Sequence, residues 1–472
     1  MNLAIPIALI HLLGAVSSVR AILDVRTSQG AIAWAVALNA FPYLSVPAYW
    51  VFGRNKFHGY IVRRRGELIK TSPVAQQFAE QLVRRGLLAE VGREHSLLVQ
   101  NLAKLPFTRY NDVELLIDGE ATFRSILSGI DDAREFILVE YYILRDDQIG
   151  RELRHRLIRK AREGVVVRVL YDELGSKDLS ESYISDLLSA GVQIHPFNTR
   201  QGEANRWQLN FRNHRKIVVV DGRTAWVGGL NVGDEYLGRD PKVGAWRDTH
   251  VKLTGPAAAG VQMAFVEDWH WAAQEMLDLR WDPQRASTGA NRSVTCVASS
   301  PSDPQETCTL FFLQAINSAR QVLWIASPYF VPDEQFISAL QLAAMRGVDV
   351  RVLIPHKSDS LLVQLSAWSY LPDLDRVGIR MFQHREGFMH QKVMLVDDRF
   401  ATVGTANFDN RSFRLNFEIT AAVADEDFAA EVRKMLEDDF CGARRISADD
   451  LAERGFWFRL ATRVARLMAP IQ

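Results

Sequence analysis

The sequence contains the same set of chemically active side chains twice. In each copy a histidine is followed two positions later by a lysine, and an aspartate stands five positions after that lysine. A glycine and an asparagine complete the pattern, and both copies fit H-x-K-x4-D-x6-G-x-x-N without a gap. The polar members are His214, Lys216, Asp221 and Asn231 in the first copy, and His390, Lys392, Asp397 and Asn407 in the second.

These residue types suit a phosphodiester substrate. Lys216 and Lys392 would neutralise the non-bridging oxygens, and Asn231 and Asn407 would donate hydrogen bonds to them. Donors aimed at developing charge usually supply the largest part of a rate enhancement. One histidine would attack phosphorus and form a phosphohistidine, and the other would protonate the leaving alcohol and deprotonate the accepting one. Because the lysines supply the positive charge, we expect neither a metal ion nor a cofactor.

Four aspartates and glutamates have supporting roles in this prediction. An attacking imidazole works best when a carboxylate holds its second nitrogen. Asp248 in WRDTHVKL and Glu418 in NFEITAAV, each on a β-type run after a motif, are the candidates, the alternative being ordinary acids at a strand end. We count Asp221 and Asp397 with the catalytic set as motif members. We expect both to hold a turn or a salt bridge rather than to touch substrate, since Asp221-Gly222 is a typical hairpin turn.

The elements that position the motifs belong to a duplicated body. A histidine and a lysine two positions apart on a strand share one face, and the runs after both motif lysines are β-type. Three further segment pairs match in the same order: AREFILVEYYI with ARQVLWIASPYF, GVVVRVLYD with GVDVRVLIP, and GVQIHPF with GIRMFQH. Strands alternating with helices indicate an α/β sheet, so the repeat predicts two copies of one α/β unit, residues 108–285 and 290–450. Packed face to face, the two copies would complete one site.

The N-terminal segment is predicted to be a two-helix membrane anchor, residues 1–55. It holds two apolar runs, Leu3–Val19 and Gly30–Phe52. A spanning helix needs about 20 apolar residues, so the second run qualifies easily and the first only marginally, and prolines could kink or break the second. A signal peptide is disfavoured because no Lys or Arg precedes Arg20, and a buried soluble helix pair is the remaining alternative.

Basic segments flank the body at both ends. Residues 56–107 are predicted to be a basic linker and a helix, and their Lys and Arg residues place the chain from residue 54 onward on the cytoplasmic side. Residues 454–472 are predicted to form an amphipathic helix, because arginines alternate with Phe, Trp and Leu. Such a helix suits an anionic membrane surface, although a terminal helix docked on the body is the alternative.

The composition argues mildly against a nucleic-acid-binding protein. Acidic and basic residues balance at 56 each, whereas a nucleic-acid binder of this size is usually basic. The cysteines Cys296, Cys308 and Cys441 form no C-x-x-C pair, which leaves no zinc ribbon or disulfide framework to expect. The histidines show no H-E-x-x-H spacing, so no metal site is predicted.

The paired motifs resemble the phospholipase D superfamily, and the chain is most similar to its bacterial cardiolipin synthases. The stretches that carry this closer resemblance are RTSQGAIAWAVAL, YWVFGRNKF, EYYILRDDQIG, NVGDEYLG, WRDTH, SPYFVPDE and NFDNRSFRLNFE. The resemblance implies two phospholipase D-like α/β/α sandwich halves with central mixed sheets. It also implies an enzyme of the bacterial inner membrane that moves a phosphatidyl group between phosphatidylglycerol molecules, giving cardiolipin and glycerol.

The resemblance also assigns individual roles. It implies that His214 is the nucleophile and His390 the general acid, with an exchange of roles left open. The superfamily often has a serine after the first glycine of G-x-x-N, and that hydroxyl contacts the phosphate. Thr405 keeps the hydroxyl and is assigned to substrate binding, whereas Gly229 lacks it.

Three alternatives to a cardiolipin synthase remain at this point. A hydrolytic phospholipase D or another phosphatidyltransferase would use the same residues, because only the group that resolves the phosphohistidine differs. A nuclease would predict a basic body without an anchor. A non-catalytic membrane scaffold is disfavoured by two intact motifs. The sequence leaves the oligomeric state and the second lipid substrate open.

Overall fold

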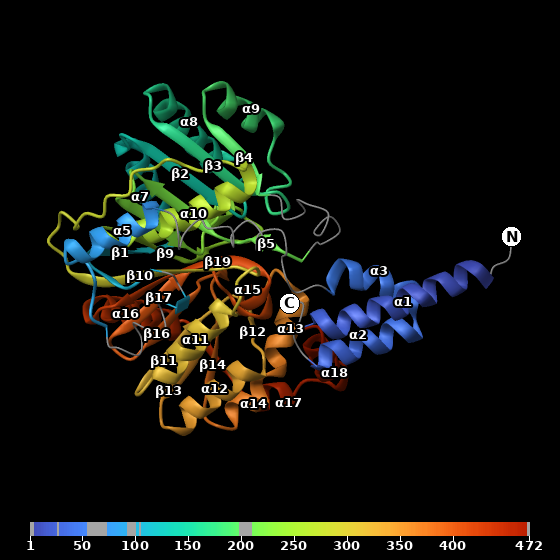
Figure 1. Ribbon diagram of the computed structural model, residues 1–472. Coiled ribbons are helices and arrows are strands. Elements are labelled where there is room, and N and C mark those ends of the chain that lie inside the picture. The colour runs from blue at the N-terminus through green and yellow to red at the C-terminus, as the bar shows by residue number, and fades with distance from the viewer. Residues whose placement is uncertain are drawn as a thin grey trace.

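The computed structural model describes residues 4–25, 28–53, 73–91, 101–102, 105–197 and 210–469 (Figure 1). The basic residues of the predicted linker between Arg54 and Lys70 lie outside this part, and so do residues 92–100 and 103–104 of the segment that follows α5 (Pro73–Arg84). The proposed orientation of the chain in a membrane therefore remains a prediction from sequence.

The N-terminal apolar runs form three helices, α1 (Ala4–Asp24), α2 (Ser28–Ala40) and α3 (Pro42–Phe52). The expectation that the second run spans more easily is wrong, because that run breaks between α2 and α3. Pro42 has no N–H to continue α2 and restrains the residue before it, so it begins a new helix instead. Among the described residues, one helix is long and apolar enough to cross a membrane, Ile5–Asp24 within α1.

Helices α1 and α2 pack closely against each other. At Gly14 an added Cβ would lie 2.3 Å from the carbonyl oxygen of Leu38, so only glycine permits this approach. Across the same interface Asn39 Nδ2 donates to Ser18 Oγ at 2.7 Å. The three helices therefore form a hairpin-like unit, whose outer surface exposes most of its large apolar side chains.

The first half of the body alternates strands and helices. Its elements are β1 (Thr108–Ile117), α7 (Asp118–Asp132), β2 (Phe136–Tyr141), α8 (Gln148–Arg162), β3 (Val166–Asp172), α9 (Glu181–Ser189), β4 (Gln193–Phe197), β5 (Arg212–Asn213), β6 (Lys216–Val220), β7 (Thr224–Gly228), the 3-10 helix η1 (Asp234–Leu237), β8 (Trp246–Arg247), β9 (Thr249–Thr254) and α10 (Ala258–Ala273).

The second half repeats this order and then adds a C-terminal extension. Its elements are β10 (Arg292–Ser299), α11 (Thr307–Ser318), β11 (Val322–Ala326), β12 (Phe330–Val331), α12 (Glu334–Met345), β13 (Asp349–Pro355), α13 (Leu361–Ser369), α14 (Leu371–Asp375), β14 (Arg380–His384), β15 (Phe388–Met389), β16 (Val393–Val396), β17 (Phe400–Gly404), β18 (Phe408–Asp409), α15 (Asn410–Arg414), β19 (Asn416–Ala424), α16 (Glu426–Cys441), β20 (Arg444–Ile446), α17 (Ala448–Ala452) and α18 (Phe456–Leu467).

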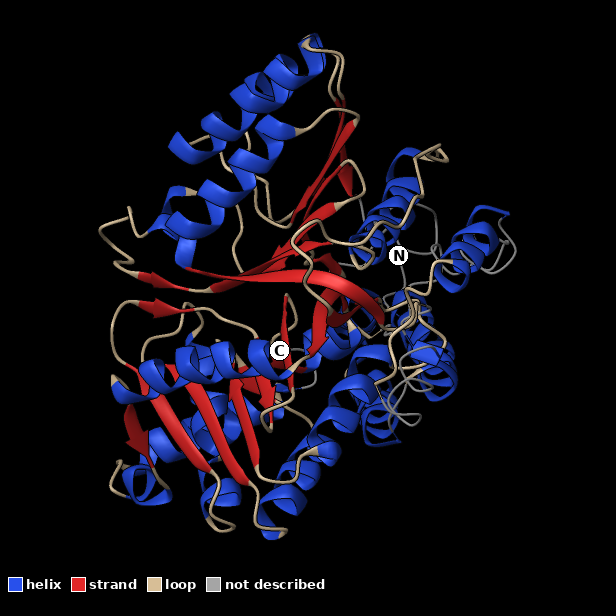
Figure 2. Cartoon of the chain, turned by 90° about the vertical axis from the view of Figure 1, so that its left-hand side faces the viewer, coloured by secondary structure: helices blue, strands red, loops and turns tan. Residues whose placement is uncertain are grey.

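The duplicated α/β fold with mixed sheets is confirmed. From the junction outward the strand order is β1-β9-β7-β6-β2-β3-β4 in the first half and β10-β19-β17-β16-β11-β13-β14 in the second. Within each half, the strands beyond the motif strand pair in parallel and those between it and the junction pair antiparallel. Figure 2 shows the strands of both halves with helices packed along their faces.

The halves meet differently from the face-to-face packing expected. Strands β1 and β10 pair antiparallel, which joins both sheets edge to edge into one sixteen-stranded sheet. The halves also exchange short parallel pairings, β5 with β19 and β8 with β15. A shared apolar core that includes residues of both α10 and α16 lies across this junction. The segment before each motif is thus held by the opposite half.

Candidate functional site

The two motif histidines enter the site from equivalent positions. His214 follows β5 and its N–H donates to the carbonyl of Phe417 at 2.9 Å, while His390 follows β15 and donates to the carbonyl of Arg247 at 2.8 Å. Each main-chain acceptor belongs to the opposite half. Both side chains are buried, with 8% of each residue exposed. The edge pairings β5–β19 and β8–β15 therefore fix both histidines at the junction of the halves.

Each histidine is paired with a carboxylate of the other half. His214 Nδ1 lies 3.0 and 3.1 Å from the carboxylate oxygens of Glu418, and His390 Nδ1 lies 2.8 Å from Asp248 Oδ2. Sequence reasoning selected both acids but left their pairing open. A carboxylate on Nδ1 selects the tautomer that leaves Nε2 with a free lone pair. Neither half contains a complete histidine–carboxylate pair by itself.

Thr405, which sequence reasoning assigned to substrate binding, contacts the carboxylate of Glu418 in the structure. Its hydroxyl donates to Glu418 Oε2 at 2.6 Å and accepts from the N–H of Ile419 at 2.9 Å. A hydroxyl has one proton, so Thr405 has none left to donate to a phosphate oxygen in this arrangement. Thr405 instead holds the carboxylate partner of His214.

The glycine that replaces the expected hydroxyl in the first half has a structural explanation. A Cβ at Gly229 would lie 2.0 Å from Asp248 Oδ1. The carboxylate of Asp248 thus occupies the space that a side chain at position 229 would need. The two halves support their carboxylates differently, with a threonine hydroxyl at Glu418 and an open glycine backbone at Asp248.

The lysines lie beside their histidines, but the motif residues do not share a strand as predicted, because His214 precedes β6 and the pair His390 and Lys392 lies between β15 and β16. Lys216 Nζ donates to the carbonyl of His214 at 2.7 Å, and Lys392 Nζ donates to the carbonyl of His390 at 2.5 Å. Burial lowers the pKa of Lys216 to about 7 and that of Lys392 to about 8, although Glu418 and Asp248 act in the opposite direction. Burial makes the charged form of both lysines costly, so an anion between them, such as a phosphate, would stabilise that form.

Both histidines favour the neutral form, because the pKa of each is lowered. Burial lowers the pKa of His214 to about 4, even though Glu418 favours its protonated form. Burial and the charges of Lys392 and Lys216 hold the pKa of His390 well below its ordinary value. Each histidine responds to the lysine of the other half, so the four groups share one site.

The pKa values of Asp248 and Glu418 are shifted in opposite directions. Burial raises the pKa of Asp248. Burial acts in the same direction on Glu418, but His214, Lys216 and the hydroxyl of Thr405 together hold its pKa below the ordinary value. The carboxylate beside His214 is therefore the more firmly ionised of the two.

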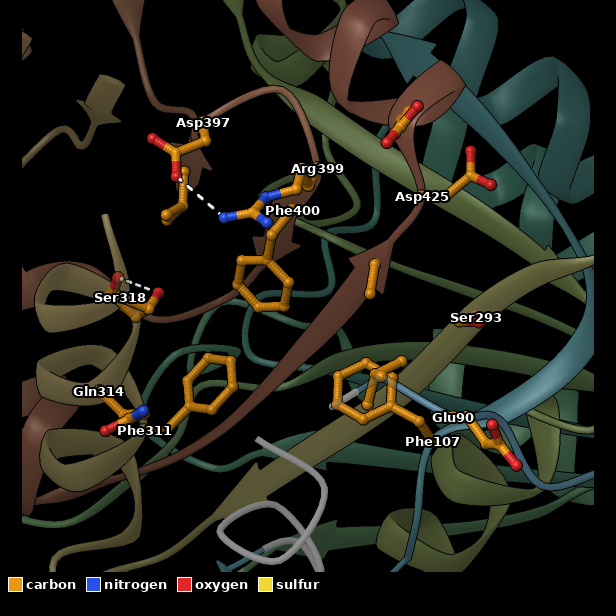
Figure 3. A pocket seen from close by; sticks show the side chains of 15 residues that line it. Glu90, Phe107, Ser293, Phe311, Gln314, Ser318, Asp397, Arg399, Phe400 and Asp425 are labelled. Atoms are coloured by element: carbon orange, nitrogen blue, oxygen red, sulfur yellow. Dashed lines mark hydrogen bonds and ion pairs between the residues drawn. The ribbon is translucent and has the colours of Figure 1, made fainter. Parts of the chain in front are cut away.

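The motif aspartates lie at the far end of their strands from the histidines. Asp221 accepts hydrogen bonds from the N–H groups of residues 134–136, and Asp397 accepts them from residues 320–322, at 2.7–3.2 Å. Both have positive φ, 52° and 53°, as a tight hairpin turn requires. Asp397 lines a separate pocket of about 460 Å³ with Arg399 (Figure 3). At about 3.3 Å per residue, Lys392 and Asp397 stand roughly 16 Å apart along the strand.

The motif asparagines have different surroundings. The side-chain oxygen of Asn231 accepts from the N–H of Ile143 at 3.1 Å, and its Nδ2 donates to the hydroxyl of Tyr236 at 3.1 Å. Only one of its two amide hydrogens is thus left for substrate. Asn407 is buried, and its side-chain oxygen has no hydrogen-bond partner among the residues that the structure describes. The predicted symmetry of the two amides is therefore incomplete.

Sequence reasoning missed a buried polar network behind the first motif. Arg215 donates to Asp268 at 2.6 Å and to the carbonyl of Glu418 at 3.1 Å, and Asn213 donates to Asp268 and Glu140. The signal was present, since Asn213 and Arg215 flank His214, but their partners come from a helix and a strand remote in sequence. In the second half Gln391 occupies the place of Arg215 and donates to Asp439.

An aromatic ring packs against each of the two motif histidines. Tyr142 packs edge-on against His214 with ring centroids 5.1 Å apart, and Trp246 packs against His390 at 5.2 Å. Rings at this distance exclude water from the imidazoles and restrict their rotation. The arrangement combines two buried imidazoles of fixed tautomer with two ammonium groups, which is a set for in-line displacement at a phosphodiester.

Comparison with known proteins agrees with this chemistry. Residues 126–250 and 312–440 match the family described as "Cardiolipin synthase, PLD-like domain", one match in each half. Cardiolipin synthase A of Pseudomonas putida strain GB-1 is 48% identical over 470 residues, covering 98% of this chain and 97% of that protein. The protein of the same name from Pseudomonas fluorescens strain Pf-5 is 45% identical over the same length.

A solved structure shares the fold at lower identity. Phosphatidylserine synthase of Haemophilus influenzae Rd KW20 superposes with a TM-score of 0.62 and 16% identity. The match covers 80% of this chain and 100% of that structure.

Proposed function

Since this chain belongs to the cardiolipin synthase family of phospholipase D-type phosphatidyltransferases, we propose that it transfers a phosphatidyl group between two phosphatidylglycerol molecules through a phosphohistidine on His214. The observation that carries the proposal is the crossed pairing of His214 with Glu418 and of His390 with Asp248. It supplies one activated imidazole for attack and a second for proton transfer at a single site.

In the first step His214 Nε2 attacks the phosphorus of phosphatidylglycerol. The N–P bond forms as the bond from phosphorus to the glycerol headgroup breaks, and His390 donates a proton to the departing glycerol oxygen. Lys216 and Lys392 balance the charge of the non-bridging oxygens throughout. The bound anion offsets the lysine charges that lower the pKa of His390, so substrate binding itself favours the protonated acid.

In the second step the phosphatidyl group moves to the acceptor. A primary hydroxyl of the second phosphatidylglycerol attacks phosphorus, His390 takes its proton, and the N–P bond to His214 breaks. The products are cardiolipin and an enzyme in which His214 is free and His390 is again protonated, as it was in the complex with the first phosphatidylglycerol. Firm ionisation of Glu418 supports His214 as the nucleophile, because a nearby negative charge stabilises the imidazole ring while it carries positive character.

The proposed setting is the bacterial inner membrane with the catalytic body on the cytoplasmic side. The relatives and the apolar helix α1 indicate membrane association. The cytoplasmic orientation rests on the basic residues that follow α3 in the sequence. Phospholipid is the substrate class, and phosphatidylglycerol is proposed as both donor and acceptor.

The test compares wild type with His214→Ala and the control His155→Ala, which removes an exposed histidine of α8. Each full-length protein receives phosphatidylglycerol alone in mixed micelles, and the lipids and free glycerol are quantified. We expect cardiolipin and glycerol in equal amounts from wild type and His155→Ala, and neither from His214→Ala. Phosphatidic acid as the only product would instead establish a hydrolytic phospholipase D, the second candidate.

A further inference from the structure

The C-terminal helix α18 is docked on the body by one face and leaves an apolar stripe uncovered. Its Thr462 and Ala465 are buried, and Phe458 meets Trp368 of α13 edge-on with ring centroids 5.7 Å apart. The uncovered side chains recur at spacings of three and four, which places them on one face of a helix. They are Trp457, Leu460, Val464 and Leu467, with 78%, 42%, 53% and 77% exposed.

The arginines of this segment divide between the body and the solvent. Arg466 pairs with Asp373 at 2.8 Å, and Arg454 lies over the ring of Trp368. Arg459 and Arg463 are exposed and follow one border of the apolar stripe at 100° per residue. An apolar face bordered by exposed arginines is typical of a helix that lies in the plane of an anionic bilayer surface.

Hydrogen bonds bring α18 and the N-terminal helices to the same place beside the site. The carbonyl of Phe52, which ends α3, accepts from Asn210 Nδ2 at 2.9 Å, and the carbonyl of Asn210 accepts from Arg411 at 2.8 Å. The carbonyl of Ala469, just beyond α18, accepts from Asn410 Nδ2 at 3.0 Å. Asn410 and Arg411 are consecutive in α15, the helix that leads into the strand carrying Glu418.

Exposed apolar side chains also lie near the part of the site that contains His390. Asp359 accepts a hydrogen bond from Tyr329 at 2.7 Å and lies close enough to His390 to act on its charge. Two exposed leucines follow almost at once, Leu361 with 70% and Leu362 with 40% of the residue exposed. They begin α13, the helix on which α18 packs. Figure 1 shows α18 on the side of the body from which α1–α3 project.

We propose that α1–α3, the start of α13 and the stripe of α18 form one membrane-facing surface beside the histidine site. Its partner is a bilayer that contains anionic phospholipid, and α18 lies along the bilayer surface. The histidine site is thereby held close to the lipid headgroups, where phosphodiesters are found. The inference rests on the membrane setting of the proposed function but not on which histidine is the nucleophile.

The test measures the depth of a spin label on the full-length protein in vesicles of phosphatidylglycerol and phosphatidylethanolamine. Exposed Cys441 is replaced by serine, which leaves the buried Cys296 and Cys308. A label is then attached to Leu467→Cys or to the control Met345→Cys, since Leu467 is 77% and Met345 in α12 is 74% exposed.

We expect the label at position 467 to lose its collisions with a water-soluble nickel chelate and to keep those with oxygen, while the label at 345 stays accessible to both. Equal access to nickel at both positions would overturn the proposal. Strong spin–spin coupling between labels at 467 in detergent without phospholipid would also overturn it, because a second copy of the chain would then cover the stripe.

A second variant separates this inference from the proposed function. Arg459→Glu combined with Arg463→Glu should lower activity on bilayer phosphatidylglycerol by about tenfold or more, given the attraction of each arginine to an anionic surface. Activity on a dispersible short-chain phosphatidylglycerol should be unchanged. Equal activity of variant and wild type on bilayers would count against the docking surface. If the bilayer shields the label at position 467 from the nickel chelate but the wild-type protein makes no cardiolipin, only the proposed function is refuted.

Discussion

Gly229→Ala is a sharp test of the crossed pairing, because it adds one methyl group and removes no polar atom. The added Cβ would lie 2.0 Å from Asp248 Oδ1, whereas ordinary contact begins at 3.4 Å. The carboxylate must therefore move by about 1.4 Å, because carbon and oxygen cannot share that space. Its hydrogen bond to His390 Nδ1, now 2.8 Å, would not survive such a shift.

The expected consequence is catalytic rather than structural. Misplacement by about 1 Å costs on the order of a hundredfold in rate when a group must be positioned for proton transfer. We therefore expect kcat for cardiolipin formation in mixed micelles to fall about a hundredfold, with a KM close to that of wild type. The thermal midpoint of unfolding should change by only a few degrees, roughly what about 1 kcal/mol produces in a domain of this size.

The matched control is Gly442→Ala, where an added Cβ meets nothing closer than 4.0 Å and φ is −81°. This variant should retain wild-type kcat. Full activity in Gly229→Ala with an unchanged melting temperature would refute the reasoning, because the pairing of His390 with Asp248 would then be dispensable. A large loss of stability together with full activity per folded molecule would refute it equally.

Four further predictions follow from the site. Glu418→Gln should lower kcat by roughly 10²–10⁴-fold in the micelle assay, because an amide no longer fixes the imidazole tautomer, while Glu437→Gln on the surface of α16 should be neutral. Since burial lowers the pKa of Lys216 to about 7 and of Lys392 to about 8, deprotonation should make kcat/KM fall as pH rises through 7–8, and a flat profile to pH 9 would contradict this sign. Asp221→Ala removes the carboxylate that accepts hydrogen bonds from three main-chain N–H groups. The free energy of unfolding measured in urea should fall by about 2–3 kcal/mol, with little change in kcat per folded molecule. A hundredfold loss of kcat would instead give Asp221 a chemical role. Arg215→Met removes the ion pair of Arg215 with buried Asp268 and should destabilise the fold by about 3–5 kcal/mol, against little effect of the exposed Arg399→Met.

The sequence was sufficient to predict the features that occur in both halves of the protein. The two motifs and the matching strands identified the duplicated fold and the four central groups, because both copies carry the same residue types at the same spacing. Asp248 and Glu418 could be named as supporting acids because each follows its motif closely in sequence, Glu418 on β19 and Asp248 between β8 and β9. Which acid pairs with which histidine could not be predicted, because that pairing depends on β5 and β8 pairing with strands of the opposite half.

The errors have local physical causes. The hydrogen bond from Thr405 to Glu418 could not be foreseen, because the family resemblance assigned this hydroxyl to the phosphate and the partner strand β19 reaches it only in the fold. The second apolar run was expected to span because its composition allows it, but Pro42 ends the hydrogen-bond ladder of α2. The partners of Arg215 were invisible because Asp268 lies on α10, and only the fold brings that helix behind the motif.

The most direct test of the proposed mechanism is the location of the covalent phosphatidyl group. His390→Asn should form the phosphohistidine slowly and resolve it poorly, so incubation with short-chain phosphatidylglycerol and rapid quenching at alkaline pH should trap it for peptide mass spectrometry. The proposed mechanism predicts a phosphatidyl adduct on His214 in wild type and in His390→Asn, and none in His214→Asn. An adduct on His390, or cardiolipin formation by His214→Asn at the wild-type rate, would contradict it.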